Sequence, residues 1–200
     1  MSRETPESIF ATAQEAMERG DWEAFFACLD HRDLLRLAGM AFGLTGGAGL
    51  CLEHGIPADA LGRVEALAQD IDESGRAMLR EVGGGQGNST AQSVLLERSL
   101  RHRDLLIAHQ KAVETCLKFV TNLASFTASA ERLKRATLGG GSVGSTLFVG
   151  ESLCDVAVNG PKATGVRRMQ RGWTEPIAFV KKKGQWYIRF LPSARSRPQR

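Results

Sequence analysis

Apolar residues recur every three or four positions through the first two thirds of the chain, the spacing that gathers them on one face of a helix. Thr5 is a suitable N-cap and Pro6 suits a first helical turn, so a helix is predicted from Pro6 until Gly20 ends it. Asp21 is the N-cap of a second helix that ends near Asp30. The short link between these helices predicts a helical hairpin.

The central part of the chain also has helical periodicity. From Asp33 the apolar residues occupy most faces, so we expect a third helix that is nearly enclosed, followed by a glycine-rich loop. Pro57 opens a further helix in which Ser74-Gly75 is a candidate break. The longest helical tract begins near Ser89 and runs to about Lys134, with one bend or break expected.

Beyond the glycine-rich segment 139–144 the period changes to two, which is typical of β-strands. The intervening turns are short, so neighbouring strands should be antiparallel. We expect one face of the sheet to lie under helices and the other to be partly exposed to water. Five strands are predicted: Ser145–Val149, Leu153–Val158, Lys162–Arg171, Pro176–Lys182 and Gln185–Leu191.

The predicted elements give an α+β fold with helices first and sheet last. A length of 200 residues with 42% hydrophobic content can bury one good core, which favours a single domain. We therefore predict one α+β domain over residues 1–192 and a basic tail at 193–200. The domain comprises a helical hairpin at 1–30, a helical insertion at 31–138 and an antiparallel sheet at 145–191.

Composition indicates a cytoplasmic protein. The N-terminal stretch is polar and lacks the apolar core of a secretory signal. The most apolar run, Leu34–Leu52, is interrupted by Arg36 and several glycines, which makes it a poor membrane span. The four cysteines form no Cys-x-x-Cys pair, so we expect buried thiols without a metal or cofactor: Cys28, Cys51, Cys116 and Cys154.

Two ends of the chain resemble one superfamily. Residues 20–25 (GDWEAF) open the second helix, and residues 156–164 (VAVNGPKAT) and 176–188 (PIAFVKKKGQWYI) form strands joined by a lysine-glycine hairpin. These segments resemble the start and the closing strands of nuclear transport factor 2-like domains, including the SnoaL-like group. The likeness covers the first 30 and the last 50 residues.

The resemblance implies a cone of curved antiparallel sheet with the first helices laid across its concave face. Such a cone usually encloses a pocket or supports a dimer. Family members usually have one short helix between the hairpin and the sheet. The long helical region 31–138 of this chain departs from that pattern and expands the centre of the fold.

Most short motifs lack the context that their chemistry needs. Residues 140–144 match the Gly-x-Ser-x-Gly nucleophile elbow, but no histidine follows Ser142 because the last one is His109. We interpret this segment as a glycine connector. His102 and His109 are seven residues apart and can share a helical face, yet a metal would need further ligands, so we interpret them as polar-face residues.

Asp155 is the candidate catalytic residue, because enzymes of the resembling fold often carry an acid or base inside the cone. Strand alternation places Asp155 on one face with Leu153, and Val156 and Val158 on the other. The valine face should point to the core. This pattern favours an outward, solvated Asp155 over a catalytic one.

Charge is distributed unevenly along the chain. Of 26 Lys and Arg residues, 18 lie after residue 100, whereas 16 of 22 Asp and Glu residues lie before it. The basic strands indicate either binding of nucleic acid or another polyanion, or a solvated sheet that faces acidic helices or an acidic partner. The candidate binding residues are aromatic or basic: Trp22, Phe26, Arg167, Trp173 and Trp186.

These observations lead to three functional hypotheses. The first is a non-enzymatic, bacterial-type binding or interaction protein with a protein partner or a homodimer through the sheet, and with a small-molecule ligand as a further option. The second is a SnoaL-like cyclase, isomerase or hydratase that uses general acid/base chemistry in the cone. The third is polyanion binding through the basic strands and tail.

Overall fold

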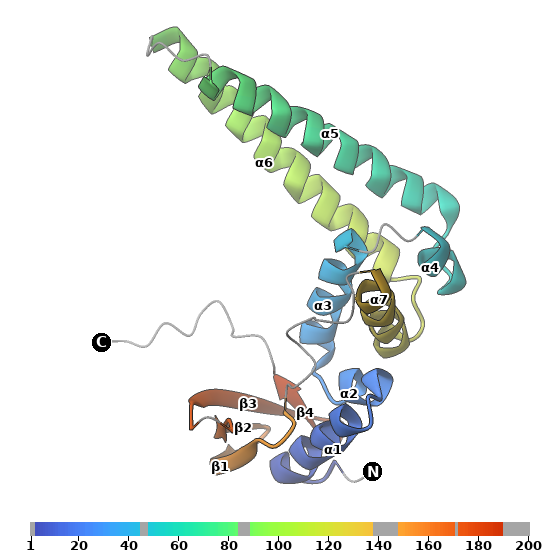
Figure 1. Cartoon of the computed structure of the whole chain (residues 1–200), viewed down its shortest axis with the longest axis vertical. Helices are drawn as coiled ribbons and strands as arrows, with labels where there is room; N and C mark the ends of the chain where they lie inside the picture. The colour runs from blue at the N-terminus through green and yellow to red at the C-terminus, as the bar shows by residue number, and fades with distance from the viewer. Residues whose placement is uncertain (1–2, 45–47, 84–88, 138–147, 171, 190–200) are drawn as a thin grey trace. The chain divides into compact units, whose positions relative to one another are not determined.

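The computed structural model describes residues 3–44, 48–83, 89–137, 148–170 and 172–189. Within these ranges the chain forms seven helices and one four-stranded antiparallel sheet, so the predicted α+β class is confirmed (Figure 1). The residues cluster into two compact units. We call residues 1–45 with 122–200 the α+β unit, and residues 46–121 the helical unit.

Four helices belong to the α+β unit: α1 (Pro6–Glu18), α2 (Trp22–Ala27), α3 (His31–Leu44) and α7 (Leu123–Thr137). The Thr5 hydroxyl accepts the backbone N–H of Ser8 at 3.1 Å, and the Ser8 hydroxyl accepts that of Thr5, which completes a capping box at α1. Asp21 caps α2 by accepting from the N–H of Ala24 at 3.0 Å. Both helix starts agree with the sequence prediction.

The sheet is a simple meander of strands β1 (Ser152–Asn159), β2 (Lys162–Arg168), β3 (Thr174–Lys182) and β4 (Gln185–Arg189). Each strand pairs antiparallel with the next, because short turns join them. At the β4 edge, Ile188 also forms a parallel bridge with Leu29. The segment after α2 therefore covers part of this edge.

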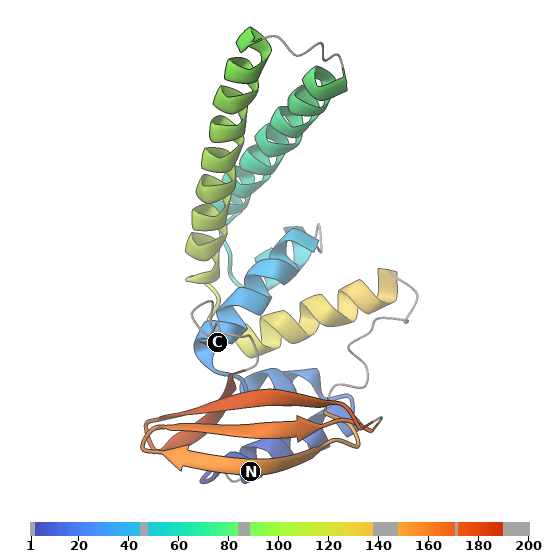
Figure 2. The same ribbon diagram turned by 90° about the vertical axis from the view of Figure 1, so that its left-hand side faces the viewer.

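Helices α1 and α2 lie against one face of the sheet (Figure 2). Alternate sheet residues on this face are buried. Aromatic rings connect α1 and α2 to the turn before β1, with Phe148 at 5.1 Å from Phe10 and 5.6 Å from Phe25 between ring centroids. The sheet contributes these buried residues: Ala163, Arg167, Ile177, Phe179, Trp186 and Ile188.

Two predictions for this unit need correction. The third helix is not nearly enclosed: α3 buries Leu34 and Ala38, but Met40 is 62% exposed. The first predicted strand ended in Phe148 and Val149, and these residues form a turn in which Phe148 has a φ of 68°. The remainder of that strand, the glycine segment 139–144 and the tail 193–200 lie outside the described residues.

The helical unit contains α4 (Ala48–Glu53), α5 (Ala58–Gly83) and α6 (Ser89–Leu117). Helix α5 runs unbroken through Ser74-Gly75, where a break was expected. The predicted long tract does break once, because α6 ends at Leu117 and α7 begins at Leu123. Residues 48–53 are helical, although the sequence predicted a glycine-rich loop there.

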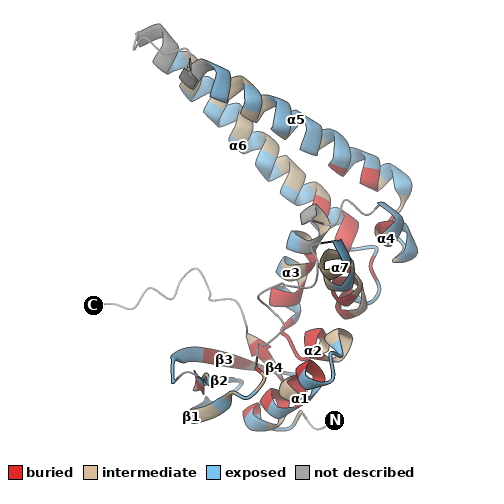
Figure 3. Cartoon of the chain, viewed as in Figure 1, coloured by how far each residue is buried: buried red, intermediate tan, exposed pale blue. Residues whose placement is uncertain are grey.

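Burial in the helical unit is concentrated at one end of the α5–α6 hairpin, while most of both helices is exposed or half-buried (Figure 3). The two long helices pack against each other along their length. The buried apolar residues of this unit are Cys51, Ile56, Leu61, Val64, Val113, Cys116, Leu117 and Val120. Toward the tip of the hairpin, Leu79 is 73% exposed.

Candidate functional site

A groove of about 350 Å³ in the α+β unit runs between the α2–α3 junction and the β3–β4 hairpin. Its walls combine apolar and charged side chains. Ala27, Leu29 and Leu34 supply the apolar part. The polar lining residues are Asp30, His31, Lys182, Lys183 and Tyr187.

Asp30 is the most deeply buried polar residue of this groove, at 3% exposure. Its backbone N–H donates to the carbonyl of Ile188 at 2.8 Å, which holds the α2–α3 junction on β4. Its carboxylate forms an ion pair with the ammonium of Lys182 and lies 3.8 Å from the Nε of Arg189. A buried carboxylate needs such partners, so both cations stabilise the junction as well as the groove.

Asp33 lies one helical turn beyond Asp30 and is fully buried. Sequence periodicity marked both aspartates as helix-boundary residues and did not predict their burial. They stand in the polar run Asp30-His31-Arg32-Asp33, whose composition carries no signal of a buried site.

Arg167, a candidate binding residue, lies in the core at 6% exposure. Its Nε is 3.0 Å from the Glu151 carboxylate, and its Nη2 donates to Glu175 at 2.8 Å. Its guanidinium carbon is 4.9 Å from the Phe148 ring centroid. The Arg167 charge is thus paired inside the protein. Its ion pairs link β2 to Glu175 of β3 and to Glu151 in the turn before β1.

Glu151 is the acidic partner of this cluster. Burial raises the pKa of the Glu151 carboxyl, while the Arg167 charge and the hydrogen bond from the Phe148 N–H lower it in part. The Gln14 amide of α1 donates to the carbonyl oxygens of Phe148 and Glu151 at 2.8 and 2.6 Å. These contacts tie the turn before β1 to α1.

Asp155 is exposed and has a φ of 54°, a left-handed conformation that non-glycine residues rarely adopt. It lies in a β-bulge, because the β1–β2 register shifts between Cys154 and Ala157. Opposite the bulge, a Cβ built on Gly165 would lie 2.9 Å from the Leu153 side chain. A larger residue at this position of β2 would thus require the Leu153 side chain to move.

The bulge also corrects the predicted alternation of β1. Leu153 pairs with Arg167 and Val158 pairs with Ala163, and both partners point to the buried face of β2. Leu153 and Val158 thus share a face, although they are five residues apart. A strict period of two assigned them to opposite faces, so that prediction is wrong across the bulge.

The aromatic candidates fall in three different environments. Trp186 and Phe26 are buried in the core. Trp22 is half-buried beside α7, with the Arg135 guanidinium carbon 4.3 Å from its ring centroid. Trp173 is 74% exposed at the start of β3. Only Trp173 among these four offers an open ring face for stacking, so the described residues do not form an aromatic platform.

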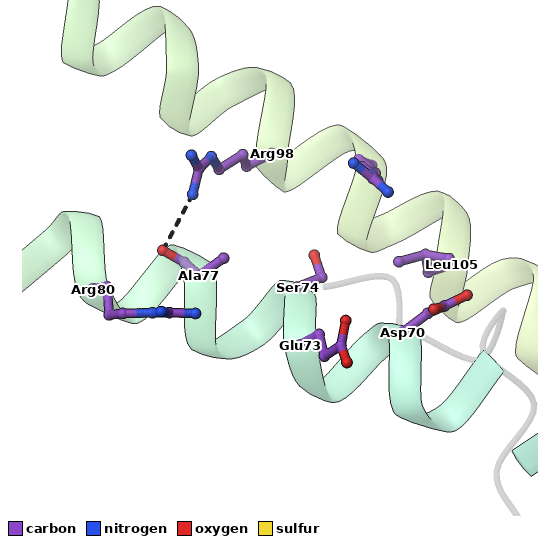
Figure 4. Close-up of a pocket in the computed structure, with 8 residues that line it drawn as sticks. Asp70, Glu73, Ser74, Ala77, Arg80, Arg98 and Leu105 are labelled. Carbon is purple, nitrogen blue, oxygen red and sulfur yellow. Dashed lines mark hydrogen bonds between the residues drawn. The ribbon is translucent and has the colours of Figure 1, made fainter. Parts of the chain in front are cut away.

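The helical unit has a larger cavity, of about 590 Å³, between α5 and α6 (Figure 4). Asp70 and Glu73 lie on its α5 side. Arg98 reaches across from α6 and donates to the Ala77 carbonyl at 3.4 Å. The cavity is lined by both signs of charge at helical spacing, which is typical of an open seam between two helices.

The histidine pair predicted to share a face is on the half-buried part of α6. The His102 ring lies against α5, where a Cβ built on Gly75 would be 3.8 Å from its Cε1 atom. Across the described parts of the chain, no three His, Cys, Asp or Glu side chains gather closely enough to hold a metal ion. A methyl group at position 75 would therefore make an ordinary van der Waals contact with the imidazole ring.

The described helices include none with the length and apolar composition that a bilayer crossing requires. Comparison with protein-family models, with curated proteins and with solved structures found no match to this chain. Exposed large apolar side chains gather on α6, which carries Leu96, Leu100, Leu106 and Ile107.

Proposed function

We propose that this chain is a non-enzymatic protein-interaction protein in which the α5–α6 hairpin is the partner-binding arm. The observation that carries the proposal is the exposure of large apolar side chains on α6. Leu96 is 63% exposed, and three more are between 43% and 47% exposed: Leu100, Leu106 and Ile107. Apolar side chains grouped on one element mark interaction surfaces in soluble proteins.

We further propose that the α+β unit is a nuclear transport factor 2-like scaffold. In support, α1 and α2 form the expected hairpin and lie on one face of an antiparallel sheet. The Leu29–Ile188 bridge joins the hairpin exit to the last strand. On this proposal the helical unit is the insertion that gives the scaffold its binding arm.

A site-specific crosslink tests the interaction arm. A photoreactive amino acid at position 100 should give a covalent adduct of one discrete mass in cells that express the chain. The same residue at position 79, which is exposed on α5, is the matched control and should give none. Equal adducts at both positions, or none at either, would contradict the proposal.

A second candidate function is binding of an anionic ligand in the groove beside β4. His31, Lys182 and Lys183 place three basic side chains around it, and Lys183 is exposed. The groove volume of about 350 Å³ is at the lower end for small-molecule sites. In this second candidate function, Lys182 and Lys183 supply the positive charge that binds a polyanion. The buried Arg167 has no such role.

Retention on heparin at increasing salt tests this second candidate. Lys183→Ala should lower the eluting salt concentration, because it removes an exposed charge from the groove without disturbing the Asp30 ion pair. Arg132→Ala, an exposed charge on α7, is the control. Equal elution of the two variants would argue against a site in the groove.

A further inference from the structure

Helix α6 has apolar side chains on two opposite faces. Its inner face, which includes Leu105 and Cys116, is directed toward α5. Leu96, Leu100 and Ile107 lie on the opposite face, as their exposure indicates. An α-helix turns by 100° per residue, so Leu96 and Leu105 differ by half a turn. Helix α5 therefore cannot cover both faces.

The exposed face has the spacing of a helix-pairing seam. Positions 96, 100, 103 and 107 follow intervals of four, three and four, the pattern that interlocks two helices. We call Leu96, Leu100, Arg103 and Ile107 the α6 outer seam. It extends over roughly 16 Å of helix at 1.5 Å per residue. Three large apolar residues and one central arginine form it.

We propose that the α6 outer seam pairs in an antiparallel arrangement with the same seam of a second copy of this chain. This inference rests on the proposed interaction arm and names its partner. The proposed dimer contact lies on α6, whereas the hypothesis from the sequence was a homodimer through the sheet. The pairing would give α6 a helix on each side, as its two apolar faces require.

The charge of Arg103 selects the second copy and the orientation. In a parallel pair, Arg103 would face the partner's Arg103, and two like charges at one seam layer repel. In an antiparallel pair centred between residues 101 and 102, Leu96 faces the partner's Ile107. Arg103 then lies beside the partner's Leu100, one turn from the partner's Glu97. Each copy thus supplies the carboxylate that the other copy's arginine needs.

Arg103 has no strong partner of its own in the single chain. Its Nη2 is 3.5 Å from Asp104, and these side chains are 64% and 68% exposed. A pair at that distance and exposure contributes little to stability. The guanidinium is therefore available for an intermolecular contact.

Sedimentation equilibrium of the full chain tests the dimer. The wild type should be dimeric, and the double variant Leu96→Glu with Ile107→Glu should weaken association by at least about 100-fold, because each outer layer of the seam then holds two facing carboxylates. Leu79→Glu, exposed on α5, is the matched control and should remain dimeric. A monomeric wild type, or equal effects of the two substitutions, would overturn the proposal.

Charge reversal tests the predicted contact. Arg103→Glu should weaken the dimer roughly 10-fold, because it places a carboxylate one turn from the partner's Glu97. Adding Glu97→Arg to the same chain should restore affinity to within about 3-fold of wild type, since the opposite charges face each other again. Failure of the second substitution to restore affinity would exclude this register.

Disulfide trapping tests the orientation. In a background with Cys154→Ser, a mixture of Leu96→Cys and Ile107→Cys chains should form a mixed disulfide dimer, because these positions face each other in the antiparallel pair. Leu96→Cys alone should not crosslink, since its two copies would be about 16 Å apart. Rapid crosslinking of Leu96→Cys alone would indicate a parallel pair and overturn the proposal.

The outcomes also separate this inference from the proposed function. If the purified chain is monomeric while the photoreactive residue at position 100 captures a different protein, the arm binds a partner but the second copy is wrong. If position 100 captures nothing and the chain is monomeric, both fail. A dimer that depends on Leu96 and Ile107 and on the Arg103–Glu97 pair supports both.

Discussion

The α+β unit and the helical unit bury their apolar residues to different degrees. In the α+β unit the buried core residues include Phe126 of α7, Phe148 of the turn before β1 and Phe179 of β3, at 0–1% exposure. In the helical unit, burial stops after one end of the hairpin, and Leu79 and Leu96 are mostly exposed. A sheet covered by helices can enclose a core, whereas two helices share only one seam.

This difference assigns different roles to the two units. The α+β unit contains most of the fully buried large side chains, among them Phe126, Phe148, Phe179 and Ile188. The helical unit leaves apolar side chains available, and most of the stability of a helix in a protein comes from packing of its apolar face. On the proposed function, the hairpin carries the interaction surface and the α+β unit supplies the structural core.

The largest expected contrast comes from truncating one apolar residue in each unit. Phe26→Ala should lower the free energy of unfolding by about 3–5 kcal/mol, because Phe26 packs in the aromatic cluster with Trp22 and Phe25. Leu79→Ala should change it by less than about 0.5 kcal/mol, since Leu79 is exposed. Urea denaturation measures both. Similar losses in the two variants would contradict the comparison.

Removing the central charge of the buried cluster should have the next largest effect. Arg167→Met should destabilise the α+β unit by roughly 3 kcal/mol, because it leaves the Glu151 carboxylate buried without its cation. The double variant Arg167→Met with Glu151→Met should recover most of this loss. Arg168→Met, at the exposed neighbouring position, is the control. A neutral Arg167→Met would show that the ion pair contributes nothing.

The buried thiols allow the two units to be compared by reactivity. Burial raises the pKa of Cys28 in the α+β unit and of Cys51 in the helical unit to about 11. The thiolate fractions are therefore alike, and a difference in alkylation rate at pH 8 reports local opening. We expect Cys51 to react roughly 10-fold faster, as measured by mass spectrometry of labelled peptides. Equal rates would indicate equal protection of the two units.

The smallest effect is the pH dependence from Glu151. Burial raises the pKa of Glu151 above its ordinary value, so the folded chain binds this proton more tightly than the unfolded chain. The resulting stability is fully present below the unfolded pKa and is lost as pH rises through the folded pKa. Relative to Glu151→Gln, the wild type should thus gain stability as pH falls from 7 to 4.

Chemical denaturation across this pH range checks the sign. Glu18→Gln, an exposed carboxylate of α1, is the control and should show a flatter difference. A wild-type advantage that shrinks as pH falls would mean that the attraction of Arg167 exceeds the cost of burying the Glu151 charge.

The sequence by itself determined the order of helices and then strands, but it missed α4 and predicted a strand at Phe148–Val149, which form a turn. Thr5, Asp21 and Pro57 marked helix starts because capping is a local interaction between neighbouring residues. The change of period after residue 144 indicated strands, since side-chain alternation depends only on the strand backbone. The short turns between them indicated antiparallel order. These features did not require knowledge of distant contacts.

Tertiary structure alone decided which charged residues are buried and which faces remain open. The cluster of Arg167 with Glu151 and Glu175 joins the turn before β1 to β2 and β3, so spacing in the sequence did not reveal it. The bulge at Asp155 adds one residue to β1, so the side chains after it point to the opposite face from the one that strict alternation predicts. The second apolar face of α6 became distinct only when the position of α5 showed which face was covered, because burial depends on neighbouring elements.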